Sequence, residues 1–389
     1  MRAGRSLFTA VLALLLCISF FAGCGQQAAA VPTVPAATAV SSSGPTAVPT
    51  PEPTPSPTPL PVVELQLTDG KVIDPYRLYD SKKVAHDVLS LGQLYHESIT
   101  VMSIGQTNFE NEIYAFRLGK GSTNVLITAT THARENVTTN YILRAAENLA
   151  IAYRNSASVG GYDIRNLLDK YSVYICPCNN PDGLDICNLY AEPVGVGGKI
   201  TDWTKLTWKA NGMGNDLNRN FPFQWQEMVS SEDDFKEPSK MNYPGPYPAS
   251  EPETQALMGL VNSVRFEFDI NLHTKGRIVY WRDPVNGTVP GDEKLASLLG
   301  KKLDFEVAGV TQSVGNYGGG FENWFRSVTG KPGVCLEMTT GGEGEVPYNH
   351  PARGRDTDNE VYDIYSERVL DWQRSESLIP YILTEYFSE

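Results

Sequence analysis

Apolar residues recur along most of the chain in runs that alternate between helical and strand-like spacing. Apolar positions three or four residues apart predict helices over residues 80–97 and 136–153. Strands are predicted, in chain order, over residues 98–104, 112–118, 124–129, 171–175, 266–272 and 333–338, and the last four are short apolar runs expected to be buried. Strands that alternate with helices in this way predict an α/β fold with a largely covered sheet.

The amino end has a different pattern, which is typical of an exported protein. Two arginines precede an apolar run over residues 7–22, and F-A-G-C closes it, so residues 1–23 are predicted to be a signal peptide. The ending resembles the bacterial lipobox, although Phe21 replaces the usual leucine. We therefore expect Cys24 to carry the two acyl chains that stable membrane anchoring needs. The alternative is an ordinary cleaved signal followed by a coincidental Cys24.

A low-complexity segment separates this end from the rest of the chain. Residues 24–61 are rich in Ala, Thr and Pro, and every second residue from Pro49 to Pro61 is proline. Such a composition predicts an extended, disordered tether. No second linker interrupts residues 62–389, which we expect to form one domain. The expected location is extracytoplasmic, with the domain tethered as a lipoprotein to the bacterial cell membrane.

Charge and cysteine content narrow the possible functions. The formal net charge is −13, which disfavours binding to nucleic-acid phosphates. Four cysteines lie in the body of the chain, too few for a disulfide scaffold at this length. A bridge between Cys178 and Cys187 and a set of buried free thiols remain alternatives; the other two body cysteines are Cys176 and Cys335.

Candidate metal ligands stand at the ends of two predicted strands. His132 and Glu135 follow the strand at 124–129, and His273 closes the strand at 266–272. Catalytic zinc sites use three protein ligands and leave one position for water, and two histidines with one carboxylate make such a set. Taken alone, the first pair could instead be a polar loop with an acid at a helix start.

A third motif makes the pattern specific. G-N-D-L-N-R-N-F spans residues 214–221, between the H-x-x-E pair and His273. The order of H-x-x-E, D-x-N-R-N, a strand-ending histidine and a late glutamate resembles the zinc carboxypeptidase family over about residues 75–345. Further motifs arrive in family order: N-P-D-G at 180–183, W-K-A-N at 208–211, S-E-P-E-T at 250–254 and C-L-E-M at 335–338.

The resemblance implies a single catalytic domain with a central mixed sheet, and it implies site roles. His132, Glu135 and His273 would hold one zinc ion. Glu337 would act as general base on a zinc-activated water and pass the proton to the leaving amine. Asp216 would orient the first zinc histidine. Independently of the resemblance, burying the Glu337 carboxylate inside an apolar strand costs free energy unless it has a partner, which favours a functional role for this residue.

Other positions concern the substrate. The resemblance implies that Asn218 and Arg219 grip a substrate carboxylate, for which the guanidinium fork is suited. Lys209 stands where digestive family members have arginine, and a lysine can also stabilise an oxyanion. Tyr317 is a candidate for the family's substrate-binding tyrosine, although it is out of register. Arg277 could meet an acidic substrate group or be a solvated loop charge.

W-K-A-N, H-T-K-G-R-I-V-Y-W and G-G-G-F-E-N-W-F resemble the bacterial γ-D-glutamyl–diamino acid peptidases. The leading hypothesis is therefore an extracytoplasmic zinc peptidase that cuts peptidoglycan stem peptides at the γ-D-Glu–diamino acid bond. One alternative is a general metallocarboxypeptidase that releases C-terminal amino acids. Another is a non-catalytic lipoprotein that binds peptides. Expected partners are a peptide substrate and, through Cys24, the membrane.

Overall fold

The computed structural model describes residues 60–231, 236–310, 313–339 and 372–388. The predicted signal peptide, Cys24 and the tether up to residue 59 lie outside these ranges. Residues Thr58–Glu389 form one compact unit, to which the description below refers. Among the described helices, none combines the length and the apolar character needed to cross a bilayer.

The centre of this unit is one mixed sheet of eight strands in the order β1-β2-β6-β3-β7-β10-β8-β9. The four middle strands β6, β3, β7 and β10 run parallel to one another. The pairs β1–β2, β2–β6 and β10–β8 are antiparallel, and β8 pairs with β9 in parallel. The bounds are β1 Ile99–Gln106, β2 Glu112–Gly119, β3 Thr123–Thr128, β6 Tyr171–Cys176, β7 Phe266–His273, β8 Ile278–Tyr280, β9 Glu306–Ala308 and β10 Gly333–Glu337. A separate hairpin joins β4 Ser158–Val159 to β5 Tyr162–Asp163.

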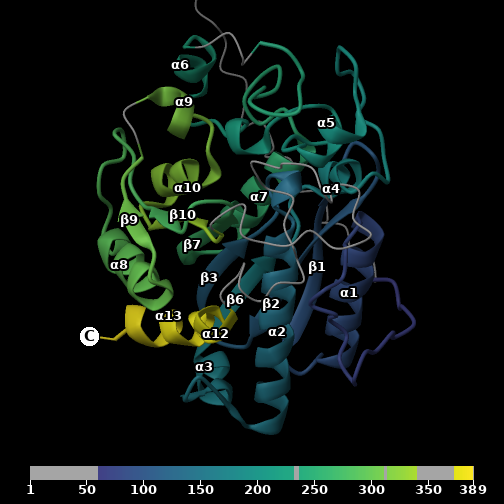
Figure 1. The fold of residues 1–389 in the computed structure, drawn as a ribbon. Helices are drawn as coiled ribbons and strands as arrows, with labels where there is room; N and C mark the ends of the chain where they lie inside the picture. Colours follow the sequence, from purple (N-terminus) through teal and green to yellow (C-terminus); the bar gives the residue numbers. More distant parts are fainter. Residues whose placement is uncertain (1–59, 232–235, 311–312, 340–371, 389) are drawn as a thin grey trace, which may run out of the picture. The chain divides into compact units, whose positions relative to one another are not determined.

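Helices cover both faces of the sheet (Figure 1). The larger apolar cluster includes residues of α1 Ser81–Leu94, α2 Val137–Asn155, α3 Ile164–Lys170, α8 Asp292–Leu303 and α13 Leu378–Tyr386. The second cluster, on the other face, includes residues of α7 Pro252–Ser263 and α10 Phe321–Thr329. Shorter helices are η1 Ala133–Glu135, α4 Pro181–Cys187, α5 Asp202–Leu206, η2 Leu217–Arg219, α6 Trp225–Val229, α9 Val314–Tyr317 and α12 Trp372–Ser375.

The predicted fold class and the predicted elements are confirmed, with shifted ends. The helix expected to reach residue 97 ends at Leu94, because Tyr95 leaves helical geometry at φ −117° and ψ 35° and its N–H closes the last turn on Leu91. At the start of α1, the Asp80 side chain accepts a hydrogen bond from the N–H of Lys83 and caps the helix. The four body cysteines are free and buried, so the thiol alternative holds.

The parallel strands bring distant parts of the chain to one edge of the sheet. His132 follows the carboxyl end of β3, His273 ends β7 and Glu337 ends β10. In the pairing of β10 with β7, Glu337 lies opposite His273. Open α/β sheets bind ligands at this edge, where the strands deliver side chains from separate segments to one place.

Candidate metal centre

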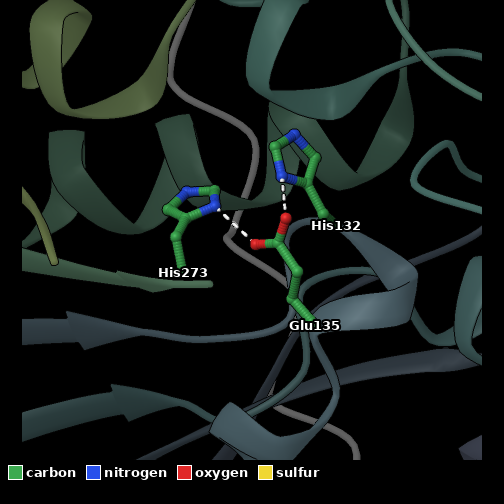
Figure 2. Close-up of side chains that lie close together, drawn as sticks. All are labelled: His132, Glu135 and His273. Carbon is green, nitrogen blue, oxygen red and sulfur yellow. Dashed lines mark hydrogen bonds and ion pairs between the residues drawn. The ribbon is translucent and has the colours of Figure 1, made fainter. Parts of the chain in front are cut away.

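Three buried side chains converge at this edge. One ligand atom from each of His132, Glu135 and His273 can be chosen so that all lie within 4.8 Å of one another. The Nδ1 atoms of both histidines face the Glu135 carboxylate, each at 2.9 Å from a different oxygen (Figure 2). Two imidazole nitrogens and a carboxylate form a donor set that suits zinc, and their convergence on one point fits a single ion.

Neighbouring polar groups fix the direction of both rings. Nε2 of His132 lies 3.2 Å from Oδ1 of Asp216, as expected for an acid that orients a ligand histidine. Nε2 of His273 lies 3.5 Å from Nδ2 of Asn218. The Asp216 carboxylate is itself held, because it accepts hydrogen bonds from the N–H groups of Asn218 and Asn242. Each ring therefore presents Nδ1 to the shared centre.

The charges around Glu135 keep it ionised. Burial alone would raise the pKa of this carboxyl, but the charges of His132, Lys209 and His273 hold it well below its usual value. Nζ of Lys209 lies 3.3 Å from Oε1 of Glu135. Lys209 is half-buried, and this distance places its ammonium beside the metal-ligand group.

Glu337 ends β10 directly opposite His273, one of the three candidate ligands. It is half-buried, its Oε2 has no hydrogen-bond partner among the described residues, and Cys335 Sγ lies 3.9 Å from Oε1. Burial, and then the charge of Glu135, raise the pKa of Glu337 to about 8. A carboxyl with a raised pKa beside a metal site is suited to accept and return a proton.

The candidate carboxylate-binding pair lies next to the same group. Asn218 donates from Nδ2 toward His273, and its Oδ1 accepts a hydrogen bond of 2.9 Å from the N–H of Phe321 at the start of α10. The Arg219 guanidinium is half-buried and donates from Nη1 to the carbonyl of Asn218. The amide therefore lies beside His273, and the guanidinium is held next to that amide by the Asn218 carbonyl.

Tyr317 is placed differently from these residues. The residue is 7% exposed and belongs to the apolar cluster under α10, and its ring centroid lies 6.4 Å from that of Phe223. Packing within this apolar cluster explains why the tyrosine is buried. Its substrate-binding role stays a prediction without a contact that supports it. Arg277 lies between β7 and β8, where its carbonyl accepts a hydrogen bond from the N–H of Glu306.

The N-P-D-G motif shapes the loop that carries Lys209. The Asn180 side chain caps α4 by accepting a hydrogen bond from the N–H of Gly183. Its amide nitrogen also lies 3.0–3.2 Å from the carbonyl oxygens of Thr131, Lys209 and Ala210. One buried amide thus ties the loop before His132 to the loop after Trp208.

Sequence reasoning missed two polar side chains behind the ligands, Asn271 and Glu322. Asn271 accepts hydrogen bonds from the hydroxyls of Thr128 and Thr131, and it lies 3.3 Å from Glu322. A signal was present in F-E-F-D-I-N-L-H, where every second residue of a strand predicted to be buried is polar or charged. That spacing places polar side chains on one face of the strand.

A His–Glu–His group at the carboxyl edge of a mixed sheet, with an acid and a lysine beside it, defines a mononuclear metal-dependent hydrolase. The family model for zinc carboxypeptidases, peptidase family M14, matches residues 88–348. The chain belongs to this family, and it is a zinc metallopeptidase that uses one zinc ion.

Individual relatives agree with this assignment. Gamma-D-glutamyl-L-diamino acid endopeptidase 1 of Lysinibacillus sphaericus is 25% identical over 277 residues, which is 70% of this chain and 68% of that protein. YqgT of Bacillus subtilis, an uncharacterized protein, is 24% identical over 294 residues, 73% of this chain and 75% of YqgT. Bovine thrombin-activatable fibrinolysis inhibitor has the same fold, with a TM-score of 0.59 over 80% of this chain and 98% of that chain at 17% identity.

Proposed function

We propose that this peptidase cleaves the γ-D-Glu–diamino acid amide of peptidoglycan stem peptides. The observation that carries the proposal is the position of Glu337 directly across from His273, beside a carboxylate and two imidazoles that suit one zinc ion. The substrate follows from the resemblance to the diamino acid endopeptidases in W-K-A-N and G-G-G-F-E-N-W-F, and from the name of the Lysinibacillus relative.

His132, Glu135 and His273 would hold the zinc ion, which when bound supplies a Lewis acid that makes water more acidic. Glu337 takes a proton from the attacking water while the water oxygen forms a bond to the amide carbon. The Lys209 ammonium stands where it can stabilise negative charge on the carbonyl oxygen. Glu337 then delivers the proton to the leaving nitrogen as the C–N bond breaks.

The substrate is oriented by a different set of groups. Arg219 and Asn218 would bind a free carboxylate on the leaving side of the bond, through the guanidinium fork and the amide. Asp216 would keep His132 in one ring orientation throughout the reaction. A substrate held at its carboxylate brings the amide carbon to Glu337 in a fixed geometry, which lowers the entropic cost of the reaction.

The proposed location is the outer face of a bacterial membrane, with Cys24 as the lipid anchor and residues 24–61 as the tether. Support comes from the apolar run, the F-A-G-C ending and the proline repeat. Cys24→Ser should shift the protein from the membrane fraction to the medium in cells that export it. If the Cys24→Ser variant stayed in the membrane fraction as fully as the wild type, the proposal that Cys24 is the lipid anchor would be wrong.

The proposed substrate specificity is tested by incubating purified protein with defined muropeptides and identifying the products by mass spectrometry. We expect zinc-dependent cleavage between γ-D-glutamate and the diamino acid, abolished by a chelator. Hydrolysis of blocked α-linked dipeptides with the muropeptides untouched would select the general carboxypeptidase instead. A protein that contains zinc and turns over no peptide would select the non-catalytic binder.

A further inference from the structure

The Glu135 carboxylate divides the metal-ligand group into two sides. Its Oε1 lies 2.9 Å from Nδ1 of His132, and its Oε2 lies 2.9 Å from Nδ1 of His273 (Figure 2). Asn218, proposed above to bind a carboxylate on the leaving side of the bond, lies beside His273. Lys209, proposed to stabilise the carbonyl oxygen, lies instead on the Oε1 side, at 3.3 Å. The acyl part of the substrate should therefore extend from the metal-ligand group past Lys209.

A second segment of the chain, around Lys240, lies directly against the loop that carries Lys209. The carbonyl of Lys240 accepts hydrogen bonds from the N–H groups of Lys209 and Ala210, at 2.9 and 3.0 Å. Two residues further on, the N–H of Asn242 donates to the carboxylate of Asp216 at 3.0 Å. The backbone around Lys240 is therefore fixed against two loops that carry site residues.

Two cationic side chains meet at a residue shortly before Lys209. Nζ of Lys240 donates a hydrogen bond to the hydroxyl of Thr207 at 3.2 Å, and Nη1 of Arg134 donates to the carbonyl of the same residue at 3.3 Å. Arg134 stands between the first two candidate ligands in the sequence, and its N–H is bonded at 2.9 Å to the carbonyl of Trp208. Both cations are thus held by the loop that carries Lys209.

Lys240 is half-buried, yet it forms no ion pair with an acid among the described residues. Burial, and then the charge of Arg134, lower the pKa of Lys240. Lys205 on α5, two residues before Thr207, is by contrast paired with Glu192 at 2.6 Å. A partly buried cation beside another cation costs free energy until an anion joins them. The contrast therefore points to an anion that arrives with a ligand.

The γ-D-glutamyl residue of the proposed substrate carries such an anion. It is linked through its side-chain carboxyl group, so its α-carboxylate stays free and is separated from the scissile carbonyl by a short carbon chain. With the carbonyl oxygen at Lys209, this carboxylate extends toward the two cations that are bonded to Thr207. Lys240 has donors to offer it, because an ammonium carries three and Thr207 accepts only one of them.

We propose that Lys240, with Arg134 beside it, binds the free α-carboxylate of the γ-D-glutamyl residue on the acyl side of the scissile bond. This inference rests on the proposed function and names the substrate feature by which this side of the site selects, an anion next to the γ-linked carbonyl. A carboxylate accepts charge-assisted hydrogen bonds from both cations and offsets their mutual repulsion. A substrate whose α-carboxylate is converted to an amide brings no charge to them and should react more slowly for that reason.

The test compares two γ-D-glutamyl–diaminopimelate peptides that differ only at the α-carbon of the glutamyl residue, which carries either a free carboxylate or a carboxamide. We expect kcat/KM for the carboxylate peptide to exceed that for the amide peptide by at least about tenfold, the effect of losing one hydrogen bond to a charged group. In Lys240→Gln this preference should shrink, because hydrolysis of the carboxylate peptide slows while that of the amide peptide stays nearly unchanged.

Two further variants separate a binding role of Lys240 from a structural one. Lys240→Arg keeps the positive charge and should retain most of the preference. Lys205→Gln removes a lysine that already has an acid partner and should keep the full preference. If Lys240 only held the loop of Lys209 in place, Lys240→Gln would slow both peptides equally, and that result would overturn the inference.

Failure of the inference is separable from failure of the proposed function. Blocked α-linked dipeptides with glutamate or glutamine before the scissile bond present a carboxylate or an amide at the same number of carbon atoms from the carbonyl, without a γ linkage. Binding of the two γ-linked peptides to the Glu337→Gln variant, by calorimetry, tests the preference without turnover. Equal treatment of carboxylate and amide in the hydrolysis and binding assays, or a preference that survives in a folded Lys240→Gln protein, would overturn the inference. A carboxylate preference on α-linked peptides without cleavage of γ-linked peptides would overturn only the proposed substrate.

Discussion

Glu337 illustrates how the surroundings of one side chain prepare it for a reaction. It lies at the end of an apolar strand, where burying a charged carboxylate costs free energy. Burial and the charge of Glu135 raise the pKa of Glu337 to about 8. A metal ion at the neighbouring group would add positive charge and lower that pKa toward neutrality. Near neutrality both protonation states are available, as proton transfer requires.

Glu337→Gln should retain the zinc ion and lose hydrolysis. The amide has nearly the same shape but cannot accept the proton, so we expect kcat to fall by about 10²–10⁴-fold. Metal content and kcat are measured together, with Glu306→Gln on the exposed strand β9 as the control, for which both values should stay at wild-type levels. Turnover near normal in the Glu337 variant would reject it as the base.

The sequence identified the side chains that carry unusual chemistry, because their motifs have fixed spacing and order. It did not identify Asn271 or Glu322, which depend on the pairing of β7 with β10 and on the approach of α10 to Gly333. The alternation in F-E-F-D-I-N-L-H indicates that Asn271 lies on a polar face of its strand, but the groups that meet it there are set by tertiary contacts. The described contacts of Tyr317 lie within the apolar cluster under α10, and its substrate-binding role stays a prediction.

The short helix α4 contributes no candidate metal ligand, but a side chain at its start fixes the loops that carry site residues. Asn180 at its start accepts the helix N–H of Gly183 and donates to carbonyls of Thr131, Lys209 and Ala210. Its removal would take this donor from the buried carbonyls of Thr131 and Ala210, at a cost of about 1–3 kcal/mol for a carbonyl left unpaired, whereas the carbonyl of Lys209 would keep the hydrogen bond from the N–H of Ala133. The segments on either side of the metal-ligand group would then lose their common anchor.

Asn180→Ala should therefore lower both stability and kcat/KM. Asn188→Ala is the matched control, because Asn188 lies at the other end of α4 and donates to the carbonyl of Tyr79. We expect both variants to lower the unfolding free energy, and only Asn180→Ala to lower kcat/KM at saturating zinc. Chemical denaturation and steady-state kinetics measure the two effects. Equal kinetic losses in both variants would contradict a specific role for Asn180.

Elements with strong periodicity were predicted well from the sequence. The eight apolar segments read as helices or strands all exist, with ends shifted by a few residues. Strands β8 and β9, at one end of the sheet, were not predicted, because each has only three residues and pairs with a strand that is distant in sequence or equally short. Helices α7, α8, α10 and α13 were also not predicted, and two of them, α7 and α10, cover the face of the sheet that carries the site.

Stability of the whole unit should depend on pH through a second acidic group, distant in sequence from the metal ligands. Glu253 at the start of α7 is fully buried, and burial followed by the charges of Asp182 and Glu251 raises its pKa to about 8. The folded state thus binds a proton that the unfolded chain releases at a lower pH. Stability falls as the pH rises between the two pKa values.

Glu253→Gln should remove that part of the pH dependence. Between about pH 5 and pH 8 the wild-type protein should lose unfolding free energy relative to the variant, by an amount on the order of a few kcal/mol. Denaturant unfolding at several pH values measures the difference, with Glu306→Gln as an exposed control. A wild-type protein that gains stability relative to the variant over this range would refute the assignment.

Hydrolysis by this protein requires a zinc ion held by His132, Glu135 and His273. The most direct measurement is zinc content by mass spectrometry together with peptide hydrolysis, for the wild-type protein, His273→Ala and the exposed control His96→Ala. We predict one zinc ion per chain and full activity in the wild type and the control, with both lost in His273→Ala. A wild-type protein that hydrolyses peptides without metal, or a His273→Ala variant that keeps zinc and activity, would contradict the account.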